Sequence, residues 1–536
     1  MLTQVFTFLL FTGFVAFIAY RQIISQVNNT SEGYFLGGRS LTAIVIAGSL
    51  LLTNISTEHL IGMNGSAYRN GAIIIAWEVT SAIALVVAAI YLAPRYLKMG
   101  ITTIPQFVAR RFDENLRGMI AGLLIVSFVC TILPIVLYTG ALNVESIFNL
   151  SELFGASKQS TIVVTILIMG GIGSAYAIFG GLKTIAVTDT INGIGLLILG
   201  LLVPIMALSM IGDGNIWSGL TKVYEHAPEK FNVVSNEVSV GAGSRDSIMP
   251  FSTLFTGLII IQLYFWTMHQ SIIQRVLGAV SLEEAQKGLL LTGLFKILIP
   301  LIVAFPGIIA FYYFGDKLYD SQDEVYPMLV KEVLPDSLTG LFVAVLMGAI
   351  FSTFNSVLNS AATVFTLDIA PRFKTIASDD AQKLKMGKQV SIILAVGSIL
   401  VAPFVANAPA GIYQLLQQLN GIFFIPIASV IMAGFLFPRV SAFGAKCGLL
   451  FGLMFYIICN FVIEVDIHFV HLLGIEFVLN IIIMHLASLI KPNVHKFNIT
   501  DIGVVDVQNW KFLKPVSIIL ITITILIYIL LGNAGV

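Results

Sequence analysis

Long apolar runs recur along almost the whole chain, and they constrain its fold more than any other feature. Crossing a bilayer as a helix takes about 20 mostly apolar residues. Fourteen runs meet this requirement, near residues 4–26, 42–66, 72–97, 118–147, 160–179, 184–211, 250–275, 287–315, 328–369, 388–407, 410–437, 441–463, 467–489 and 514–532. They are too long for the strands of a membrane barrel, which alternate over about ten residues. The sequence therefore predicts an all-α integral membrane protein with about fourteen transmembrane helices.

The composition supports this interpretation. Of the 536 residues, 57% are hydrophobic and only 11% are charged, whereas a soluble domain carries about 25% charged residues. The formal net charge is zero, so no basic field attracts nucleic acid. The three cysteines are scattered without the spacing of a metal site. We expect one transmembrane domain over residues 1–536, and the composition excludes soluble enzymes and nucleic-acid binders.

The positions of lysine and arginine predict the orientation in the membrane, because internal loops carry an excess of both. If the N-terminus is outside, the inside loops hold 21 basic residues and the outside loops hold 7. The clearest inside loops are 95–117 and 372–388. We therefore expect a multi-pass protein of the plasma (inner) membrane with both termini outside.

Polar residues interrupt the second span, which reads LLTNISTEHLIGMNGSAY over 51–68. Glu58 and His59 are ionisable, and ionisable residues inside a membrane are costly and usually functional. Broken helices with freed carbonyls hold Na⁺ in many transporters. The run favours a broken helix that lines a cavity; the alternative is a continuous helix with one polar face buried in a bundle.

Two further groups of polar residues lie inside predicted spans. Glu78 and Lys296 could neutralise one another around a polar ligand, or form a buried ion pair that only fixes helix packing. Ser352 and Thr353 offer adjacent hydroxyls for a hard cation. Taken alone, however, such hydroxyls are more often bonded to carbonyls one turn earlier in the same helix.

Several long stretches resemble the sodium/solute symporter family, most closely its sodium–glucose branch with the bacterial sodium–galactose transporters. The matching stretches are EGYFLGGRSL (32–41), TNISTEHLIGMNGSAY (53–68), ITTIPQFVARRF (101–112), YAIFGGLKTIAVTD (176–189), LYFWTMHQSIIQRVLGA (263–279), EEAQKGLLLTGLFKILIP (283–300) and LNSAATVFTLDI (358–369). The resemblance implies a LeuT-type fold with two inverted five-helix repeats. The repeats would occupy about 42–211 and 250–437, with peripheral helices at 1–27, 441–463, 467–489 and 514–532.

The resemblance also implies the roles of particular residues. The solute would be bound by His59, Glu78, Ser81, Gln262, Lys296 and Gln417, between gates formed by Met63, Trp77, Phe265 and Tyr413. Sodium, the coupling ion, would be bound by carbonyls of Leu52, Ile55 and Ala349 and hydroxyls of Ser352 and Thr353. Asp189 and Arg275 match positions linked to ion coupling.

The function implied is sodium-coupled uptake of a glucose- or galactose-like monosaccharide by alternating access, with no enzymatic reaction. Three positions depart from the bacterial galactose transporters: His59 replaces a glutamine, Gln262 replaces an asparagine, and Phe265 lacks the hydroxyl of an inner-gate tyrosine. Asn192 also occupies a position where the family commonly has glutamine. The solute therefore stays open between a monosaccharide and myo-inositol, a sialic acid or a nucleoside. An uncoupled sodium channel or sugar sensor is the alternative of another class. The expected partners are a small polar solute, Na⁺ and the lipid bilayer.

Overall fold

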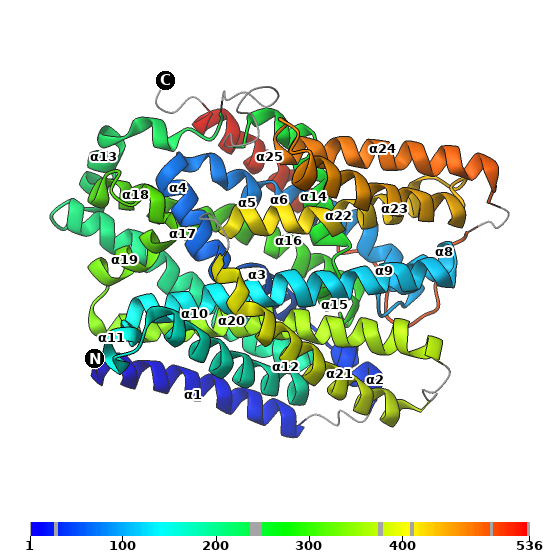
Figure 1. Cartoon of the computed structure of the whole chain (residues 1–536), viewed down its shortest axis with the longest axis horizontal. Coiled ribbons are helices and arrows are strands. Elements are labelled where there is room, and N and C mark those ends of the chain that lie inside the picture. The colour runs from blue at the N-terminus through cyan, green and yellow to red at the C-terminus, as the bar shows by residue number, and fades with distance from the viewer. Residues whose placement is uncertain are drawn as a thin grey trace.

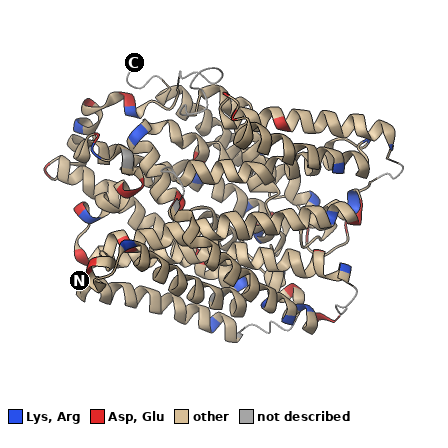
Figure 2. Ribbon diagram, in the orientation of Figure 1, with Lys and Arg blue, Asp and Glu red and all other residues tan. Residues whose placement is uncertain are grey.

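The computed structural model describes residues 2–25, 30–235, 249–373, 379–407, 412–493 and 497–532. These residues form helices packed side by side, with two isolated β-bridges. Figure 1 shows α1 along one edge of the bundle and α24 at the opposite edge. Charged residues gather at the two ends of the helices, and the middle of the bundle is almost free of them (Figure 2). The predicted all-helical membrane protein is confirmed.

The first half of the chain forms a series of long helices and short helical segments. They are α1 (Leu2–Ser25), α2 (Ser31–Leu36), α3 (Ala43–Asn54), α4 (Asn64–Asn70), α5 (Ala76–Val79), α6 (Ser81–Val87), α7 (Ala93–Met99), α8 (Ile104–Arg111), α9 (Glu114–Ser127), α10 (Leu133–Phe148), α11 (Leu150–Phe154), α12 (Lys158–Ile211) and α13 (Ile216–His226).

The second half continues in the same way. It contains α14 (Gly257–Thr267), α15 (Gln270–Leu277), α16 (Leu282–Leu298), α17 (Pro300–Val303), α18 (Phe305–Phe314), α19 (Val325–Val333), α20 (Asp336–Val364), α21 (Asp380–Val401), α22 (Ile412–Leu436), α23 (Ala442–Ile457), α24 (Phe469–Ile490) and α25 (Leu513–Leu531).

The number of membrane-crossing helices differs from fourteen when length and hydropathy are the criteria. Eleven helices of the described residues are long and apolar enough, or up to 12 when the bent pair α16 and α17–α18 counts as one span. Two further apolar helices, α3 and α14, are shorter. The difference arises because both are the first parts of broken spans. Each of the fourteen expected runs overlaps a described helix, and the runs 160–179 and 184–211 overlap the same one, α12.

The first break follows α3. Ile55 is extended, with φ −88° and ψ 103°, and a wide helical turn over His59–Met63 then leads into α4. The polar run 54–59 thus coincides with the break that it predicts. A second break lies between α14 and α15, where His269 is extended with φ −70° and ψ 122°. Each break leaves backbone groups without partners in their own helix, and these groups are available to a site.

Gly181 separates the two spans that the sequence predicts at 160–179 and 184–211. Its φ of 62° and ψ of 179° interrupt α12, and only glycine adopts this region readily. A Cβ at this position would lie 2.9 Å from the carbonyl oxygen of Tyr34. Glycine is therefore required both for the turn and for the close approach of the preceding chain.

The run at 328–369 is too long for one span, and the structure divides it at Pro335. Helix α19 ends at Val333, Leu334 is extended with φ −91° and ψ 133°, and α20 begins at Asp336. The residue before a proline is disfavoured in the helical conformation, which explains the position of the break. The remaining helix, α20, carries Ser352 and Thr353 into the protein interior.

Candidate functional site

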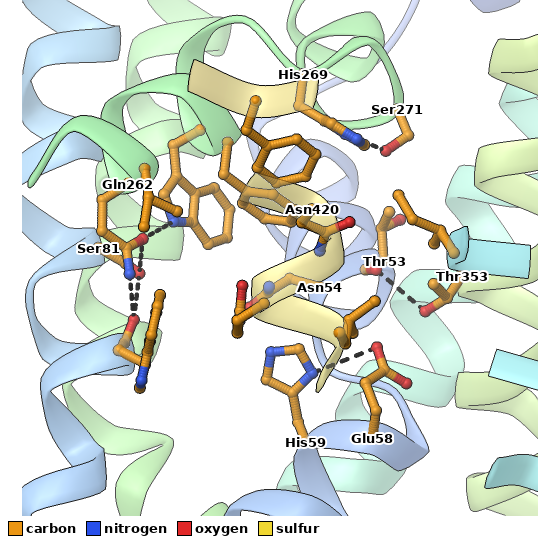
Figure 3. Close-up of a pocket in the computed structure, with 18 of the residues that line it drawn as sticks. Thr53, Asn54, Glu58, His59, Ser81, Gln262, His269, Ser271, Thr353 and Asn420 are labelled. Carbon is orange, nitrogen blue, oxygen red and sulfur yellow. Dashed lines mark hydrogen bonds and ion pairs between the residues drawn. The ribbon is translucent and has the colours of Figure 1, made fainter. Parts of the chain in front are cut away.

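A cavity of about 70 Å³ lies between the two broken spans. Figure 3 shows its lining from several helices, with Asn54 and His59 from the first broken span and His269 and Ser271 from the second. The predicted solute, gate and sodium residues that line it are His59, Trp77, Glu78, Ser81, Gln262, Phe265, Lys296, Thr353, Tyr413 and Gln417. Ligand pockets usually measure about 300–1,000 Å³. This cavity is smaller, so its walls must move apart to admit a solute.

Lys296 of α16 joins the first broken span to α5. Its ammonium contacts the carboxylate of Glu78 and donates a 2.6 Å hydrogen bond to Oδ1 of Asn54, the last residue of α3. Both charged side chains are buried. An ammonium has three donors, so a third remains for a ligand. The predicted proximity of Glu78 and Lys296 is present, and the role of Asn54 was not predicted.

The side-chain amide of Gln262 already forms hydrogen bonds with other protein groups. Its Nε2 donates to the carbonyl of Trp77 at 2.6 Å, and its Oε1 accepts from Ser81 at 2.8 Å and from Nε1 of Trp266 at 3.1 Å. Two predicted solute ligands, Ser81 and Gln262, thus bind one another across α6 and α14 (Figure 3). A solute hydroxyl would have to join this network or replace one of its bonds.

His59 lies between two carboxylates. Its Nδ1 is 3.5 Å from Oε1 of Glu58, and its Nε2 is 3.8 Å from Oε1 of Glu78. Glu58 in turn contacts the hydroxyl of Ser56 within the break. The imidazole therefore links the broken span to the Glu78–Lys296 pair. Its ring also meets Tyr413 edge-on at 5.3 Å.

Aromatic rings close one end of the cavity. Trp77 meets Tyr413 edge-on at 6.1 Å and stacks on Phe469 at 6.4 Å. Trp77, Tyr413 and Gln417 line this cavity and also a second one of about 50 Å³, which His468 and Phe469 border as well. These rings thus separate two compartments. Met63, predicted as part of this gate, is buried but lines neither cavity.

Phe469 belongs to α24, which the sequence assigns to the periphery, and no sequence pattern marked it. Its place beside Trp77 depends on how α24 packs against the core. The same is true of Asn420 and Phe424 of α22, which line the cavity and were not predicted. Amides and aromatic rings are common in apolar spans, so the sequence alone does not mark Asn420 and Phe424 as part of a binding site.

The second break contributes an aromatic cluster around His269. Its ring stacks on Phe265 at 5.3 Å and lies 5.3 Å from Phe424. Nδ1 of His269 is 2.8 Å from the hydroxyl of Ser271, and Nε2 has no hydrogen-bond partner among the described residues. The predicted gate residue Phe265 thus packs against the rings of His269 and Phe424, the latter at 6.5 Å.

The predicted sodium ligands are only partly brought together. The hydroxyl of Thr353 donates to the carbonyl of Thr53 at 3.0 Å, and the carbonyl of Leu52 lies 3.4 Å from the same hydroxyl. Hydroxyl and carbonyl oxygens suit a hard cation. Ile55 and Ala349 are fully buried beside the break and on α20. Ser352 faces another cavity, of about 100 Å³, that Asp189 also lines.

Asp189 and Arg275 form a buried pair away from the solute cavity. Oδ2 of Asp189 accepts a 2.6 Å hydrogen bond from Ser49 and lies 4.0 Å from Nη2 of Arg275. Nε of Arg275 donates to Ser49 at 3.1 Å, and its Nη2 contacts the hydroxyl of Ser356. The pair thereby connects α3, α12, α15 and α20. The interaction between the two charges therefore depends on the relative positions of these helices.

Comparison with known proteins identifies several matches over most of the chain. The family model "Sodium:solute symporter family" matches residues 34–452. An uncharacterised symporter, YidK of Escherichia coli, is 40% identical over 99% of this chain and 91% of its own length. A sodium/glucose cotransporter of Vibrio parahaemolyticus is 31% identical over 81% of this chain and 80% of its own length. The solved structure of a Na⁺-coupled sialic acid symporter in a substrate-bound, outward-open state is 19% identical, with a TM-score of 0.76 over 91% of this chain and 98% of that one. All of these are transporters rather than enzymes.

Proposed function

We propose that this chain, which belongs to the sodium:solute symporter family, takes up a monosaccharide together with Na⁺ by alternating access. The observation that carries the proposal is the polar cavity between two broken spans, with Lys296, Glu78 and Asn54 at one wall. Transporters of this kind bind solute and ion near the membrane midplane, where discontinuous helices meet. In this proposal the core consists of two inverted repeats, about 42–211 and 250–437, within fourteen membrane spans.

The side chains favour a neutral polyol over an anion. Glu78 would repel a carboxylate at the point where Lys296 would attract it, so a singly charged solute gains little from the pair. Ring hydroxyls can both accept from Lys296 and donate to Glu78 or Gln417. The ring of Trp77 or Tyr413 can stack on the apolar face of a sugar. Glucose and galactose are therefore the first solutes to test.

Sodium supplies the driving force in this proposal. It would bind oxygens of Leu52, Ile55, Ala349, Ser352 and Thr353, at the break after α3, and would stabilise the arrangement that is open to the outside. Each Na⁺ that enters the cell gains about 2.3 kcal/mol per 100 mV of membrane potential, before its concentration gradient is added. Coupling requires that Na⁺ bind the two arrangements with different affinity. The Asp189–Arg275 pair connects helices from both repeats and would respond to the change.

Opening to the outside would separate the rings of Trp77, Tyr413 and Phe469, and opening to the inside would separate the Phe265–His269–Phe424 cluster. We propose that the protein lies in the plasma membrane with both termini outside. The excess of lysine and arginine in the loops on the opposite side supports this orientation.

The test is uptake of radiolabelled glucose and galactose into proteoliposomes, with an inward Na⁺ gradient and a K⁺ gradient as control. We expect uptake that requires Na⁺ and increases with an inside-negative potential. The Lys296→Ala variant should still insert into the membrane, with lower stability, and should transport poorly. Sugar uptake that is equal in Na⁺ and K⁺ would refute sodium coupling.

Uptake of neither sugar, in a protein that still binds Na⁺, would refute the monosaccharide. It would move the search to myo-inositol, nucleosides and sialic acid, the substrate class of the symporter whose structure this fold resembles. A sodium current without any transported solute would favour the uncoupled channel.

A further inference from the structure

A basic groove lies where α8 ends, α23 begins and α24 ends. These helix ends lie at one end of the bundle (Figure 1). Its volume is about 460 Å³, and it shares no lining residue with the solute cavity. Three cations line it, Arg110, Arg111 and Lys491, and none of the lining residues is acidic. The other lining residues are uncharged: the apolar Met99, Phe112, Ala442, Phe443, Pro492 and Phe497, and the polar Ser441, Asn493, Asn498 and Thr500.

Arg111 is the only buried residue among the three cations of the basic groove, and its side chain is only partly hydrogen-bonded. The residue is 5% exposed. Its Nε donates to the carbonyl of Gly434 at 2.9 Å, and its Nη2 to the carbonyls of Phe437 and Val440 at 3.0 and 3.1 Å. Nη1 is buried and has no hydrogen-bond partner among the described residues. A buried donor without a partner costs about 1–3 kcal/mol, so this guanidinium would be stabilised by a nearby anion.

The charges in the basic groove are also unbalanced. Among the described residues, no ion pair joins Arg110, Arg111 or Lys491 to a carboxylate, and the nearby Asp113 is bound by Lys446 at 2.5 Å. Burial lowers the pKa of Arg111, but a guanidinium stays charged at neutral pH. The ammonium of Lys491 lies over the ring of Phe443, 5.0 Å from its centre. A ligand for this groove should therefore be an anion with oxygen acceptors.

The position of the basic groove indicates the source of that anion. Lys491 directly follows the membrane-spanning helix α24, and Phe443 is in the first turn of the neighbouring spanning helix, α23. The last turn of α24 exposes large apolar side chains, Leu486, Leu489 and Ile490. A headgroup in the groove would thus have its acyl chains beside an apolar surface, whereas a free phosphate would leave that surface unused. Basic pockets between spanning helices bind anionic headgroups on the cytoplasmic side of membranes.

We propose that the basic groove is a binding site for an anionic phospholipid, whose phosphate pairs with the cations that line it, Arg110, Arg111 and Lys491. The lipid would fasten the ends of α8, α23 and α24 to one another. This site is separate from solute and sodium binding, and its occupancy can be measured without transport.

The test is native mass spectrometry of the full-length protein in detergent, titrated with phosphatidylglycerol, phosphatidylcholine or inorganic phosphate. We expect phosphatidylglycerol to bind in preference to phosphatidylcholine. The double variant Arg110→Gln/Lys491→Gln should weaken phosphatidylglycerol binding roughly ten- to thirtyfold, because it removes two cations from a membrane-surface site. The matched control, Lys383→Gln/Lys385→Gln on α21, removes two charges at the same end of the bundle and should change binding less than about twofold, because neither residue lines the groove.

Equal phosphatidylglycerol binding by the double variant and the unmodified protein would overturn the proposal. Binding of inorganic phosphate that blocks phosphatidylglycerol at millimolar concentration would replace the lipid with a soluble anion and would also overturn it. If the double variant does not fold, Lys491→Gln alone serves, because that side chain is exposed and its loss disturbs no hydrogen bond among the described residues.

Discussion

The hydroxyl of Thr353 on α20 donates a 3.0 Å hydrogen bond to the backbone carbonyl of Thr53 in the last turn of α3. This bond joins the first broken span to the helix that the sequence predicts to share the sodium site. The carbonyl is near the end of its helix, where the backbone no longer bonds to itself. A cation bound at this point would take the oxygens of both groups, so the hydrogen bond and the ion compete for the same place.

Replacing Thr353 with valine removes the hydroxyl and nearly keeps the side-chain volume. We expect Na⁺ affinity to fall roughly tenfold or more, since a bond to a charged group contributes about 1.5–3 kcal/mol. The measurement is the Na⁺ concentration that half-activates solute uptake. Ser398→Ala on α21 removes another buried hydroxyl, whose one hydrogen bond among the described residues is to the carbonyl of Leu394, and it should leave that concentration unchanged. An unaltered value for Thr353→Val would exclude this hydroxyl from the ion site.

Removing the ammonium of Lys296 should destabilise the protein as well as stop transport. In Lys296→Met the carboxylate of Glu78 stays buried without its partner, a situation that costs about 3–5 kcal/mol. The double variant Lys296→Met/Glu78→Leu removes both charges and should recover most of the lost stability. Thermal denaturation in detergent, together with uptake, separates the two roles. Recovery of uptake along with stability in the double variant would show that the pair is only structural.

Phe469 should act as part of the gate although it lies on α24. Truncation in Phe469→Ala removes the ring that stacks on Trp77 at 6.4 Å, and stacked aromatic pairs contribute about 0.5–1.5 kcal/mol beyond their burial. We expect the closed arrangement to weaken and Na⁺ to leak into proteoliposomes several times faster without solute. A suitable comparison is Phe461→Ala, in the helical turn between α23 and α24. The ring of Phe461 meets Tyr456 and not Trp77. A leak equal to that of the unmodified protein would remove Phe469 from the gate.

Gly181 should not tolerate a side chain. In Gly181→Ala the alanine would have to adopt a φ of 62°, which strains an L-residue. The added Cβ would also lie only 2.9 Å from the carbonyl oxygen of Tyr34. We expect a loss of about 1–3 kcal/mol of folding free energy from the backbone strain alone, seen as a lower midpoint of thermal denaturation. Gly171→Ala, in the same helix with nothing within 4 Å of its Cβ, should be neutral or slightly stabilising. Equal midpoints for the two variants would contradict the strain.

Much of the site could be predicted because charge in hydrocarbon is costly. Glu78, Lys296 and the polar run 54–59 are conspicuous in apolar spans, and the resemblance to a symporter family assigned Glu78, Lys296 and His59 to one solute site. The structure then brought them together, with Lys296 bonded to Asn54 at 2.6 Å. Met63 did not reach the cavity, and Ser352 faces a different one from Thr353. Adjacent residues of a helix point about 100° apart, so neighbours in sequence need not share a site.

The sequence by itself determined that this chain is a helical membrane protein, where its apolar helices lie, and that the helix after residue 54 is broken. These properties depend on hydropathy and local backbone chemistry, which each segment carries alone. Only the tertiary structure decided that Asn54 completes the bonding of Lys296, that Phe469 closes over Trp77, and that Arg110, Arg111 and Lys491 share one groove. These relationships join residues far apart in sequence, and they depend on the packing of whole helices, which no local pattern encodes.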